Sequence, residues 1–370
     1  MAHPTDTAVR SVSAAAYSVP TELPEADGTL SWQATSLVVC EVTAGGVTGV
    51  GYSYAHRACI PVIEDTLADV ITGRNVLDVP GAWTAMQHAI RNAGWPGIVA
   101  CALSAVETAM YDAKARLLDL PLASLLGRCH DAMPVYGSGG FTTYDDDQAC
   151  QQLRRWVEDD GIPRVKIKIG ESWGSRVTRD LHRVAVARDT IGDAVDLYVD
   201  ANGAYSVGEA VRVGRALADH GVTWFEEPVS SDHLAGLRHV RNQVTADVTA
   251  GEYGYTLPYF ASMVQAEAVD CLQVDVTRCG GYGEWLRVAA VAAASNIDIS
   301  GHCAPNLSAH VAVATPNLRH LEYFRDHERI ERMLFDGALT PRNGAMRPDL
   351  SRSGHGLAFK RSDAEQYRVG

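Results

Sequence analysis

The stretch VDLYVDANGAYSVGEAVRVGRALADHGVTWFEEP, residues 195–228, decides the fold that this sequence predicts. It opens with a short apolar run that closes on Asp200, continues with helical periodicity, and returns to an apolar run that closes on Glu226. A strand, a helix and a second strand in about 30 residues are typical of a parallel β-α-β unit. The next apolar run, VTAGE, closes on Glu252, so successive acidic residues lie 26 positions apart.

This repeat places three carboxylates at the C-terminal ends of strands, and in a parallel barrel those ends converge on one face. Neighbouring carboxylates repel one another unless a hard divalent cation lies between them. We therefore expect a metal site made of Asp200, Glu226 and Glu252. The alternative, three unrelated surface acids in an acidic chain, is disfavoured because each of them follows an apolar run.

Short strands and helical spacers alternate through the whole region after His130. Eight strands that alternate with helices predict a (β/α)8 barrel. The expected strands cover residues 134–140, 164–170, 195–202, 222–228, 248–252, 271–276, 297–303 and 318–324.

The region before the barrel has a different pattern. Residues 8–60 have the alternation of antiparallel strands around a hairpin turn at TAGG, and residues 60–127 have helical periodicity. We expect an α+β domain over residues 1–128 and the barrel over residues 129–330. Residues 331–370 show little periodicity and are expected to pack irregularly back on the first domain.

Composition excludes several classes of function. With 32 basic and 45 acidic residues, the net charge of −13 argues against nucleic acid or an anionic membrane as the partner. The eight cysteines form no C-x-x-C pair and predict reduced thiols in a cytoplasmic protein. The sequence shows no N-terminal apolar segment and no run of 18 apolar residues, so neither secretion nor a membrane span is expected. The glycine run GGVTGVG (45–51) lies in the hairpin and opens no helix, so a nucleotide site is not expected.

Two lysines and an acid-histidine pair also lie on expected barrel strands. Lys166 and Lys168 are two positions apart, so both point to the same face of their strand, and two buried ammonium groups are costly unless they serve a site. Neighbouring positive charges lower the pKa of a lysine and allow it to act as a base. Asp275 and His302 end two successive strands, where the carboxylate can orient the imidazole as an acid or base. Glu322 occupies the same place on the last strand, with a structural salt bridge as the alternative.

The residues now identify a family resemblance. The segment ALSAVETAMYDAKARLLDLPLASLLG (102–127) resembles the end of the capping domain in the mandelate racemase subgroup of the enolase superfamily, and residues 195–228 resemble the central metal-site segment of that subgroup. The resemblance covers nearly the whole chain. It implies the modified, enolase type of TIM barrel, an N-terminal α+β capping domain, and a homo-oligomer, either a dimer or an octamer.

Residue by residue, the resemblance implies the following roles. The metal ligands for Mg2+ are Asp200, Glu226 and Glu252, with Glu227 beside them and Asn202 at the substrate. Lys166 holds the substrate carboxylate, Lys168 is a base on one face of the substrate, and Asp275 and His302 form a dyad on the other face. Glu322 hydrogen-bonds the developing enediolate, and Arg278, with the glycine pair 280–281, follows the strand-six acid. The substrate is then a small carboxylate.

These parts allow two reactions. Proton removal next to a carboxylate gives an enediolate, and loss of the C3 hydroxyl then gives a 2-keto-3-deoxy acid, whereas return of a proton to the other face gives racemisation or epimerisation. The resemblance favours dehydration of an aldonic, uronic or aldaric acid. Cycloisomerase, succinylbenzoate synthase and dipeptide epimerase activities are disfavoured, because their strand-six base is a lysine where this chain has Asp275 with His302. A non-catalytic relative is the other class of alternative, and the intact set of polar residues counts against it.

Specificity is expected from capping loops around residues 17–32 and 52–59. The candidates for contact with a polar substrate tail are Trp32, Tyr54, His56 and Arg57 from these loops, and Tyr136 and Ser138 from the first barrel strand. The aromatic side chains among them have an alternative role, which is to pack the two domains together.

Overall fold

The computed structural model describes residues 7–369. Its N-terminal part is an antiparallel sheet in the order β1-β2-β3, built from β1 (Val9–Ala26), β2 (Ser31–Ala44) and β3 (Val47–Ser53). The helices that follow are α1 (Cys59–Val62), α2 (Ala68–Ile71), α3 (Val79–Ala89), α4 (Ile98–Leu117) and α5 (Leu122–Leu126), with a π-helical turn, η1 (Ile63–Leu67), between the first two.

The glycines of the 45–51 run allow helix α4 to pack closely against strand β3. A Cβ atom built on Gly51 would lie 2.2 Å from the carbonyl oxygen of Ala105, and one on Gly49 would lie 2.2 Å from that of Ala109. Only a residue without a side chain fits at such a distance. The glycines therefore serve helix-sheet packing, in agreement with the expectation that they bind no nucleotide.

Replacing Gly51 with alanine is expected to destabilise the protein by roughly 1–3 kcal/mol, because the added methyl group must push helix α4 away from the sheet. Gly81→Ala is the matched control. Gly81 lies in helix α3 with no atom within 4 Å of the built Cβ, so this change should be neutral or stabilise by about 0.5–1 kcal/mol. Urea denaturation of both variants measures the difference, and equal stabilities would contradict the packing argument.

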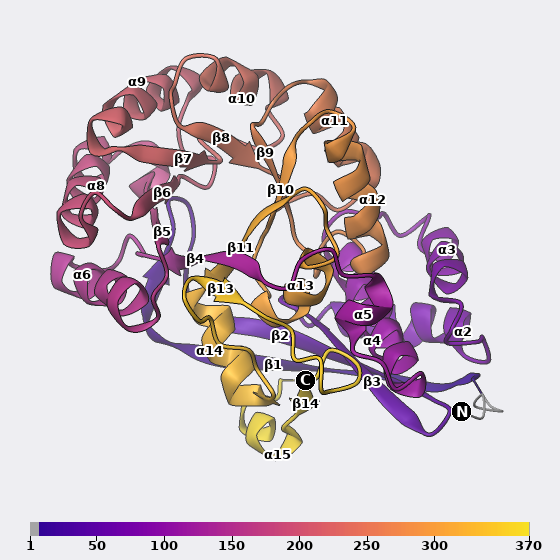
Figure 1. The fold of residues 1–370 in the computed structure, drawn as a ribbon. Helices are drawn as coiled ribbons and strands as arrows, with labels where there is room; N and C mark the ends of the chain where they lie inside the picture. Colours follow the sequence, from indigo (N-terminus) through magenta and orange to yellow (C-terminus); the bar gives the residue numbers. More distant parts are fainter. Residues whose placement is uncertain (1–6, 370) are drawn as a thin grey trace.

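The second part is a closed parallel barrel, which confirms the predicted fold class (Figure 1). The strand order runs from β4 to β11, and β11 pairs with β4 to close the cylinder. All eight expected strands are present, and most are shorter than predicted. They are β4 (Met133–Gly139), β5 (Arg164–Lys168), β6 (Asp196–Asp200), β7 (Val222–Glu226), β8 (Asp247–Ala250), β9 (Cys271–Val274), β10 (Asp298–Gly301) and β11 (Leu318–Phe324).

Helices surround this barrel. They are α6 (Asp146–Arg154), α7 (Glu171–Gly174), α8 (Val177–Ile191), α9 (Val207–Leu217), α10 (Leu234–Arg241), α11 (Leu257–Gln265), α12 (Tyr282–Ala293), α13 (Pro305–Ala312) and α14 (Arg325–Leu334), with short turns η2 (Arg155–Asp159) and η3 (Ala218–His220). Inside the barrel, the buried rings of Tyr136, Tyr198, Trp224 and His320 pack at centroid distances of 4.8 to 6.4 Å. They fill the barrel interior below the mouth.

The C-terminal segment is more ordered than its sequence suggests. Helix α14 crosses the boundary expected at residue 330, because its buried face continues to Leu334. Short strands follow: β12 (Phe335–Asp336) pairs with β14 (Ala358–Phe359), and β13 (Ala345–Met346) pairs with barrel strand β4. The chain ends in α15 (Arg361–Ala364) and η4 (Glu365–Tyr367). This end of the chain contacts the N-terminal sheet, where the ring of Tyr17 packs on Phe359.

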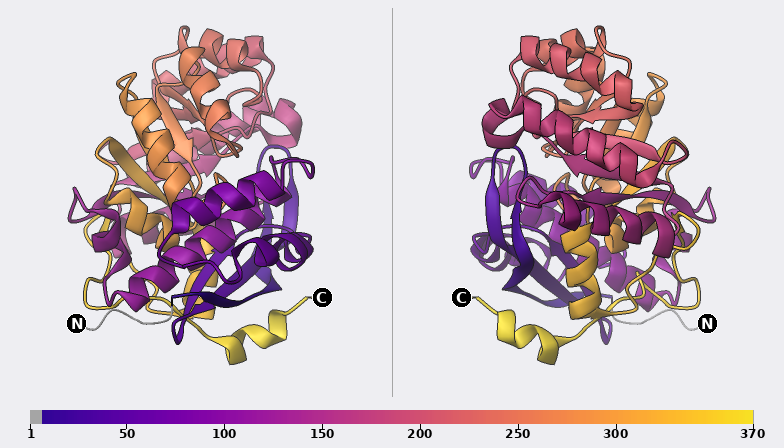
Figure 2. Two further views of the ribbon diagram at one scale, coloured as in Figure 1. Left: turned by 90° about the vertical axis from the view of Figure 1, so that its right-hand side faces the viewer. Right: turned by 90° about the vertical axis from the view of Figure 1, so that its left-hand side faces the viewer.

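The N-terminal part lies against the barrel, and the hairpin between β1 and β2 extends along it (Figure 2). At the hairpin tip, the carbonyl of Gly28 accepts a hydrogen bond from Trp173 N at 2.9 Å, and the hydroxyl of Thr142 donates to the carbonyl of Asp27 at 2.8 Å. The capping part thereby covers one side of the barrel mouth.

Two further findings concern the whole described region. Over residues 7–369, no helix combines the length and the apolar character that a membrane span requires. The eight cysteines are unpaired, and all except Cys129 and Cys150 are buried.

Candidate active site

Three buried carboxylates come together at the barrel mouth. Asp200 and Glu226 are the last residues of β6 and β7 and lie side by side in register, and Glu252 follows two residues after the end of β8. One oxygen from each lies within 4.8 Å of the others. Burial, together with the charge of Asp200, raises the pKa of Glu226. The spacing of 26 residues therefore brings together the acids that it predicts.

The backbone around these acids is strained. Asn202, Glu227 and Cys303 have φ angles of 45°, 37° and 49°, and each follows the end of a barrel strand at the mouth. Positive φ is unfavourable for residues with a side chain, and such residues are concentrated at functional sites. Asn202 Oδ1 and Glu227 Oε1 are also buried without a hydrogen-bond partner within residues 7–369. Both observations indicate a ligand site.

The two lysines of β5 point to the carboxylates, as their spacing predicts. Lys166 Nζ lies 2.5 Å from Glu226 Oε1 and 2.8 Å from Glu322 Oε1, and Lys168 Nζ contacts Asp200 Oδ2. Burial opposes the charge on Lys168, but the contact with Asp200 outweighs it and raises the pKa of Lys168. This direction is opposite to the lowered lysine pKa expected from the sequence, because that reasoning considered the neighbouring cations and left out the acid on the adjacent strand.

An aspartate and a histidine form a hydrogen-bonded dyad across the mouth from the lysines. His302 Nδ1 lies 2.8 Å from Asp275 Oδ2. Asp275 Oδ1 accepts hydrogen bonds of 2.7 Å from the backbone N–H and the hydroxyl of Thr277. Arg278 lies 3.5 Å from Asp275 and 3.4 Å from Glu252, so it links the dyad to the carboxylate cluster. This arrangement fixes the imidazole with Nε2 turned to the carboxylate cluster, 3.3 Å from Glu252 Oε2.

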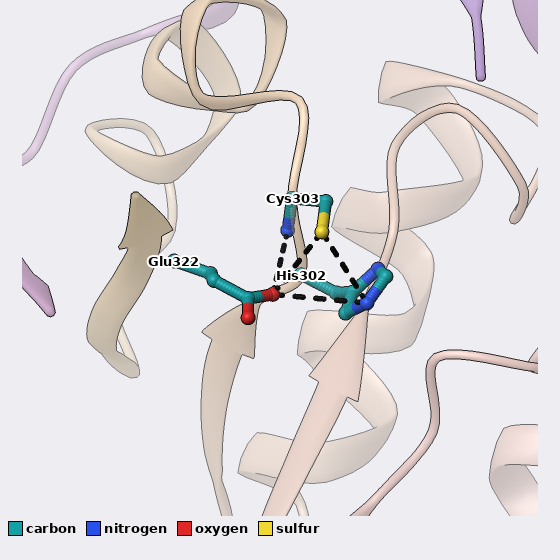
Figure 3. Close-up of side chains that lie close together, drawn as sticks. All are labelled: His302, Cys303 and Glu322. Atoms are coloured by element: carbon teal, nitrogen blue, oxygen red, sulfur yellow. Dashed lines mark hydrogen bonds and ion pairs between the residues drawn. The ribbon is translucent and has the colours of Figure 1, made fainter. Parts of the chain in front are cut away.

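Cys303 lies between the histidine and the last acid, as Figure 3 shows. Its Sγ is 3.4 Å from His302 Nε2 and 3.3 Å from Glu322 Oε2, and its backbone N–H donates to the same oxygen at 3.1 Å. Burial and the charge of Glu322 raise the pKa of the Cys303 thiol, so it remains protonated. Sequence reasoning missed this residue, although its position directly after His302 in GHCAP was a signal.

Residues 7–369 contain two clusters of potential metal ligands, and the carboxylate cluster fits a divalent cation better. Its three donors are oxygens, which are the ligands that Mg2+ prefers. The cluster of His302, Cys303 and Glu322 offers nitrogen, sulfur and oxygen atoms as donors. Its thiol is protonated, and its imidazole is hydrogen-bonded to Asp275. We therefore treat this second cluster as part of the proton-transfer machinery.

A cavity of about 330 Å3 connects these groups with the capping domain. Lys168 and the dyad histidine His302 line it from opposite arcs of the barrel, since β5 and β10 are separated by two strands on one side and four on the other. Trp32 and Tyr54 line it from the capping domain, as the sequence predicts. A larger cleft of about 510 Å3 shares Asn202 and Tyr253 with it but contains neither lysine nor the dyad.

Four predicted substrate contacts do not line this cavity. Tyr136 is packed inside the barrel below Lys166, whose Nζ is 5.3 Å from the centre of the ring. Ser138 is fully buried, its Oγ has no hydrogen-bond partner among the described residues, and it does not line the cavity. His56 is exposed, and its Nδ1 accepts a hydrogen bond from Ala58 N at 3.1 Å. Arg57 is exposed as well and does not line the cavity.

On the side of the cavity formed by the capping domain, a buried acid, Glu25, lies behind Trp32, and sequence reasoning also missed it. Glu25 Oε2 accepts a 2.9 Å hydrogen bond from Trp32 Nε1 and thereby holds the ring at the cavity. Burial, assisted by the charge of Asp326, raises the pKa of Glu25 to about 8. No periodic pattern marks this residue, since it lies where the β1–β2 register shifts.

This raised pKa predicts a pH-dependent stability. Unfolded glutamate ionises near pH 4.5, so the folded chain holds a proton more tightly between that pH and about 8 and loses stability as pH rises through this window. We expect Glu25→Gln to match the wild type at pH 5 and to be more stable by about 1–3 kcal/mol at pH 9. Denaturant titrations at both pH values measure this, with the exposed Glu22→Gln as control. The same pH dependence in wild type and Glu25→Gln would contradict the assignment.

Comparisons with known proteins agree with this geometry. A family model described as "Enolase C-terminal domain-like" matches residues 148–364, and one described as "Mandelate racemase / muconate lactonizing enzyme, N-terminal domain" matches residues 2–127. Among solved structures, the chain is similar to a mandelate racemase/muconate lactonizing enzyme-like protein from Rubrobacter xylanophilus. That match has 46% identity and a TM-score of 0.94, and covers 98% of this chain and 100% of that one.

Two other relatives carry information about chemistry. An enolase from Bradyrhizobium, solved in complex with magnesium and mandelic acid, is 29% identical with a TM-score of 0.89, and the match covers 98% of this chain and 99% of that one. The L-talarate/galactarate dehydratase of Salmonella typhimurium is 28% identical over 333 residues, which are 89% of this chain and 81% of that enzyme.

Proposed function

Since the chain belongs to the mandelate racemase subgroup of the enolase superfamily, we propose that it is a Mg2+-dependent dehydratase of acid sugars, which converts an aldonate, uronate or aldarate into a 2-keto-3-deoxy acid. The observation that carries the proposal is the pair of proton-transfer groups, Lys168 and the Asp275–His302 dyad, that line one cavity from opposite arcs of the barrel beside three converging carboxylates.

The metal-binding residues in this proposal are Asp200, Glu226 and Glu252. Bound there, Mg2+ supplies positive charge that makes a substrate carboxylate a better electron acceptor. The magnesium in the Bradyrhizobium structure supports this choice of ion. Glu227 and Arg278 adjoin the ligands, and Arg278 lies 3.4 Å from Glu252 Oε1.

Lys166 and Glu322 surround the position of the substrate carboxylate. The ammonium group of Lys166 lies 2.8 Å from Glu322, and both are almost completely buried. The charge of Lys166 favours negative charge on the carboxylate oxygens as it develops. The same charge lowers the pKa of Glu322, so Glu322 must take up a proton before it can donate a hydrogen bond to one of these oxygens. Asn202, whose Oδ1 has no partner over residues 7–369, can accept a hydrogen bond from a substrate hydroxyl.

Proton transfer then completes the reaction. Either Lys168 or His302, depending on the configuration at C2, removes the C2 proton, and the electron pair of the C–H bond enters the enediolate. The enediolate electrons form the C2–C3 double bond while the C3–O bond breaks, and His302 supplies the proton with which the hydroxyl leaves as water. The resulting enol takes up a proton at C3 and becomes the 2-keto acid.

Racemisation or epimerisation of a 2-hydroxy acid is the second candidate. The complex of the Bradyrhizobium relative with mandelic acid favours it, because mandelic acid has no hydroxyl at C3 to lose. The same two groups would act, one removing the C2 proton and the other returning a proton to the opposite face.

A dimer or octamer and a cytoplasmic location are also part of the proposal.

The test is to incubate the protein with Mg2+ in D2O and a panel of acid sugars and simple 2-hydroxy acids, with proton NMR of the products. We expect a 2-keto-3-deoxy acid from at least one acid sugar. Deuterium at C2 with inverted configuration and no loss of water would replace this assignment with racemisation. No reaction across the panel would reject both.

A further inference from the structure

The cavity has two ends of different character. At its inner end, barrel residues including Lys168, His302 and Glu322 supply the charged groups. Its outer end is lined mainly by the capping hairpin and the loop after β3, including Asp27, Trp32, Thr35 and Tyr54. Because packed rings fill the barrel below the site, a substrate held by its carboxylate at the inner end finds room for the rest of its chain toward the outer end.

The outer end carries a negative charge, while Arg278, the arginine that lines the cavity, pairs with Asp275 and Glu252 on the barrel side. Asp27 lines it, and the hydrogen bonds to its Oδ1 from the backbone N–H groups of Thr29 and Leu30, at 2.6 and 2.7 Å, hold the carboxylate there. His327 also lines it, but burial lowers the pKa of its imidazole to about 3. Its ring stacks on Tyr54 with 3.3 Å between centroids, and its Nδ1 accepts a hydrogen bond from Ala304 N.

The arginines near this end are engaged by other partners. Arg325 pairs with Glu22 and Glu328, and Arg329 pairs with Asp326 and donates to the carbonyl of Pro20. None of these arginines lines the cavity, and neither does the exposed Arg57.

Two further acids lie behind the residues that line the outer end of the cavity. Asp326 contacts the hydroxyl of Thr35, and Glu25 is buried behind Trp32. Burial, together with the negative charge of Asp326, raises the pKa of Glu25. A second carboxylate on a substrate would meet Asp27 here without a compensating cation.

We propose that the substrate is a monocarboxylic acid sugar with an uncharged, hydroxylated tail, and that diacids are rejected at the outer end by Asp27 and its acidic surroundings. In this respect it differs from galactarate, the diacid in the name of the Salmonella relative. A tail hydroxyl can donate a hydrogen bond to Asp27, and the aromatic faces of Trp32 and Tyr54 suit the C–H groups of a sugar chain. This inference rests on the proposed function and narrows its substrate class.

The test compares acids that differ only at the terminal carbon: gluconate with glucarate, and galactonate with galactarate, in kcat/KM with saturating Mg2+. For the configuration that the enzyme accepts, we expect the aldonate to exceed the matched aldarate by about tenfold or more, the penalty that a like-charge contact imposes at a partly exposed site. Preference for the aldarate, or equal rates, would overturn the inference and leave the dehydratase assignment intact. No turnover of any acid sugar in the wider panel would overturn both.

A charge variant isolates the cause. Asp27→Asn keeps the side-chain oxygen that accepts from Thr29 and Leu30, so the turn is preserved. We expect it to raise the ratio of kcat/KM for the aldarate to kcat/KM for the aldonate about tenfold. Glu22→Gln, which removes an exposed acid of the same hairpin outside the cavity, is the control and should leave the ratio unchanged. An unchanged ratio in Asp27→Asn would overturn the role of this charge.

Discussion

Replacing Lys168 with methionine or His302 with asparagine is expected to lower kcat/KM for dehydration by about 10²- to 10⁴-fold in each variant. Both side chains line the cavity, and the neighbouring Lys166 is committed to Glu226 and Glu322, so it does not replace Lys168. Both substitutions approximately preserve the volume of the side chain. The rate of 2-keto acid formation measures the loss.

A second measurement separates the roles of the two groups. In D2O, the variant that retains the base exchanges the C2 proton for deuterium although it no longer loses water, whereas the variant that lacks the base does neither. His182→Asn, which changes an exposed histidine paired with Asp146, is a control that should keep full activity. Unchanged turnover in both active-site variants would reject the assignment of Lys168 and His302.

The parts of this site that were predictable are those set by periodicity. A strand side chain that ends an apolar run in a parallel barrel must lie at the mouth, so the repeat of Asp200 and Glu226 was sufficient to place both. The same reasoning placed Lys166 and Lys168 on the inward face of their strand. These are consequences of strand geometry, and they do not depend on the loops.

Sequence periodicity gives the face of a strand but not the height of a residue in the barrel. Tyr136 faces inward as predicted, yet its ring packs against Tyr198, Trp224 and His320 in the barrel interior and does not line the cavity. Residues in loops have no period at all. Asp27 and Cys303 reach the cavity through a turn and a positive φ angle, which no alternation of apolar residues reveals.

The C-terminal segment shows the same limit at the level of the fold. Its glycine- and arginine-rich sequence predicts an irregular chain, but tertiary pairing with β4 gives the short strand β13 its order. Local pattern carries no information about such long-range pairs. The prediction was therefore best for the barrel, whose elements are defined by local repeats.

The second large effect concerns the metal. Removal of divalent cations with EDTA is expected to reduce dehydration by about 10³-fold or more, and Mg2+ should restore it, because the negative charge that develops on the substrate carboxylate is then balanced mainly by Lys166. Binding should also be visible without substrate. At a Mg2+ concentration about 100 times its Kd, the folded protein gains about 2.7 kcal/mol, so the midpoint of thermal unfolding rises.

Substitution of a ligand connects this effect to the carboxylate cluster. Glu252→Gln should lose most of the Mg2+-dependent rise in unfolding midpoint and about 10²- to 10³-fold in activity, because one of three converging charges is removed. Glu284→Gln changes another buried glutamate, paired with Arg287 on helix α12 and outside the cluster, and should keep the full response to Mg2+. If Glu252→Gln responds to Mg2+ like the wild type, the cation binds elsewhere and Asp200, Glu226 and Glu252 are not its ligands.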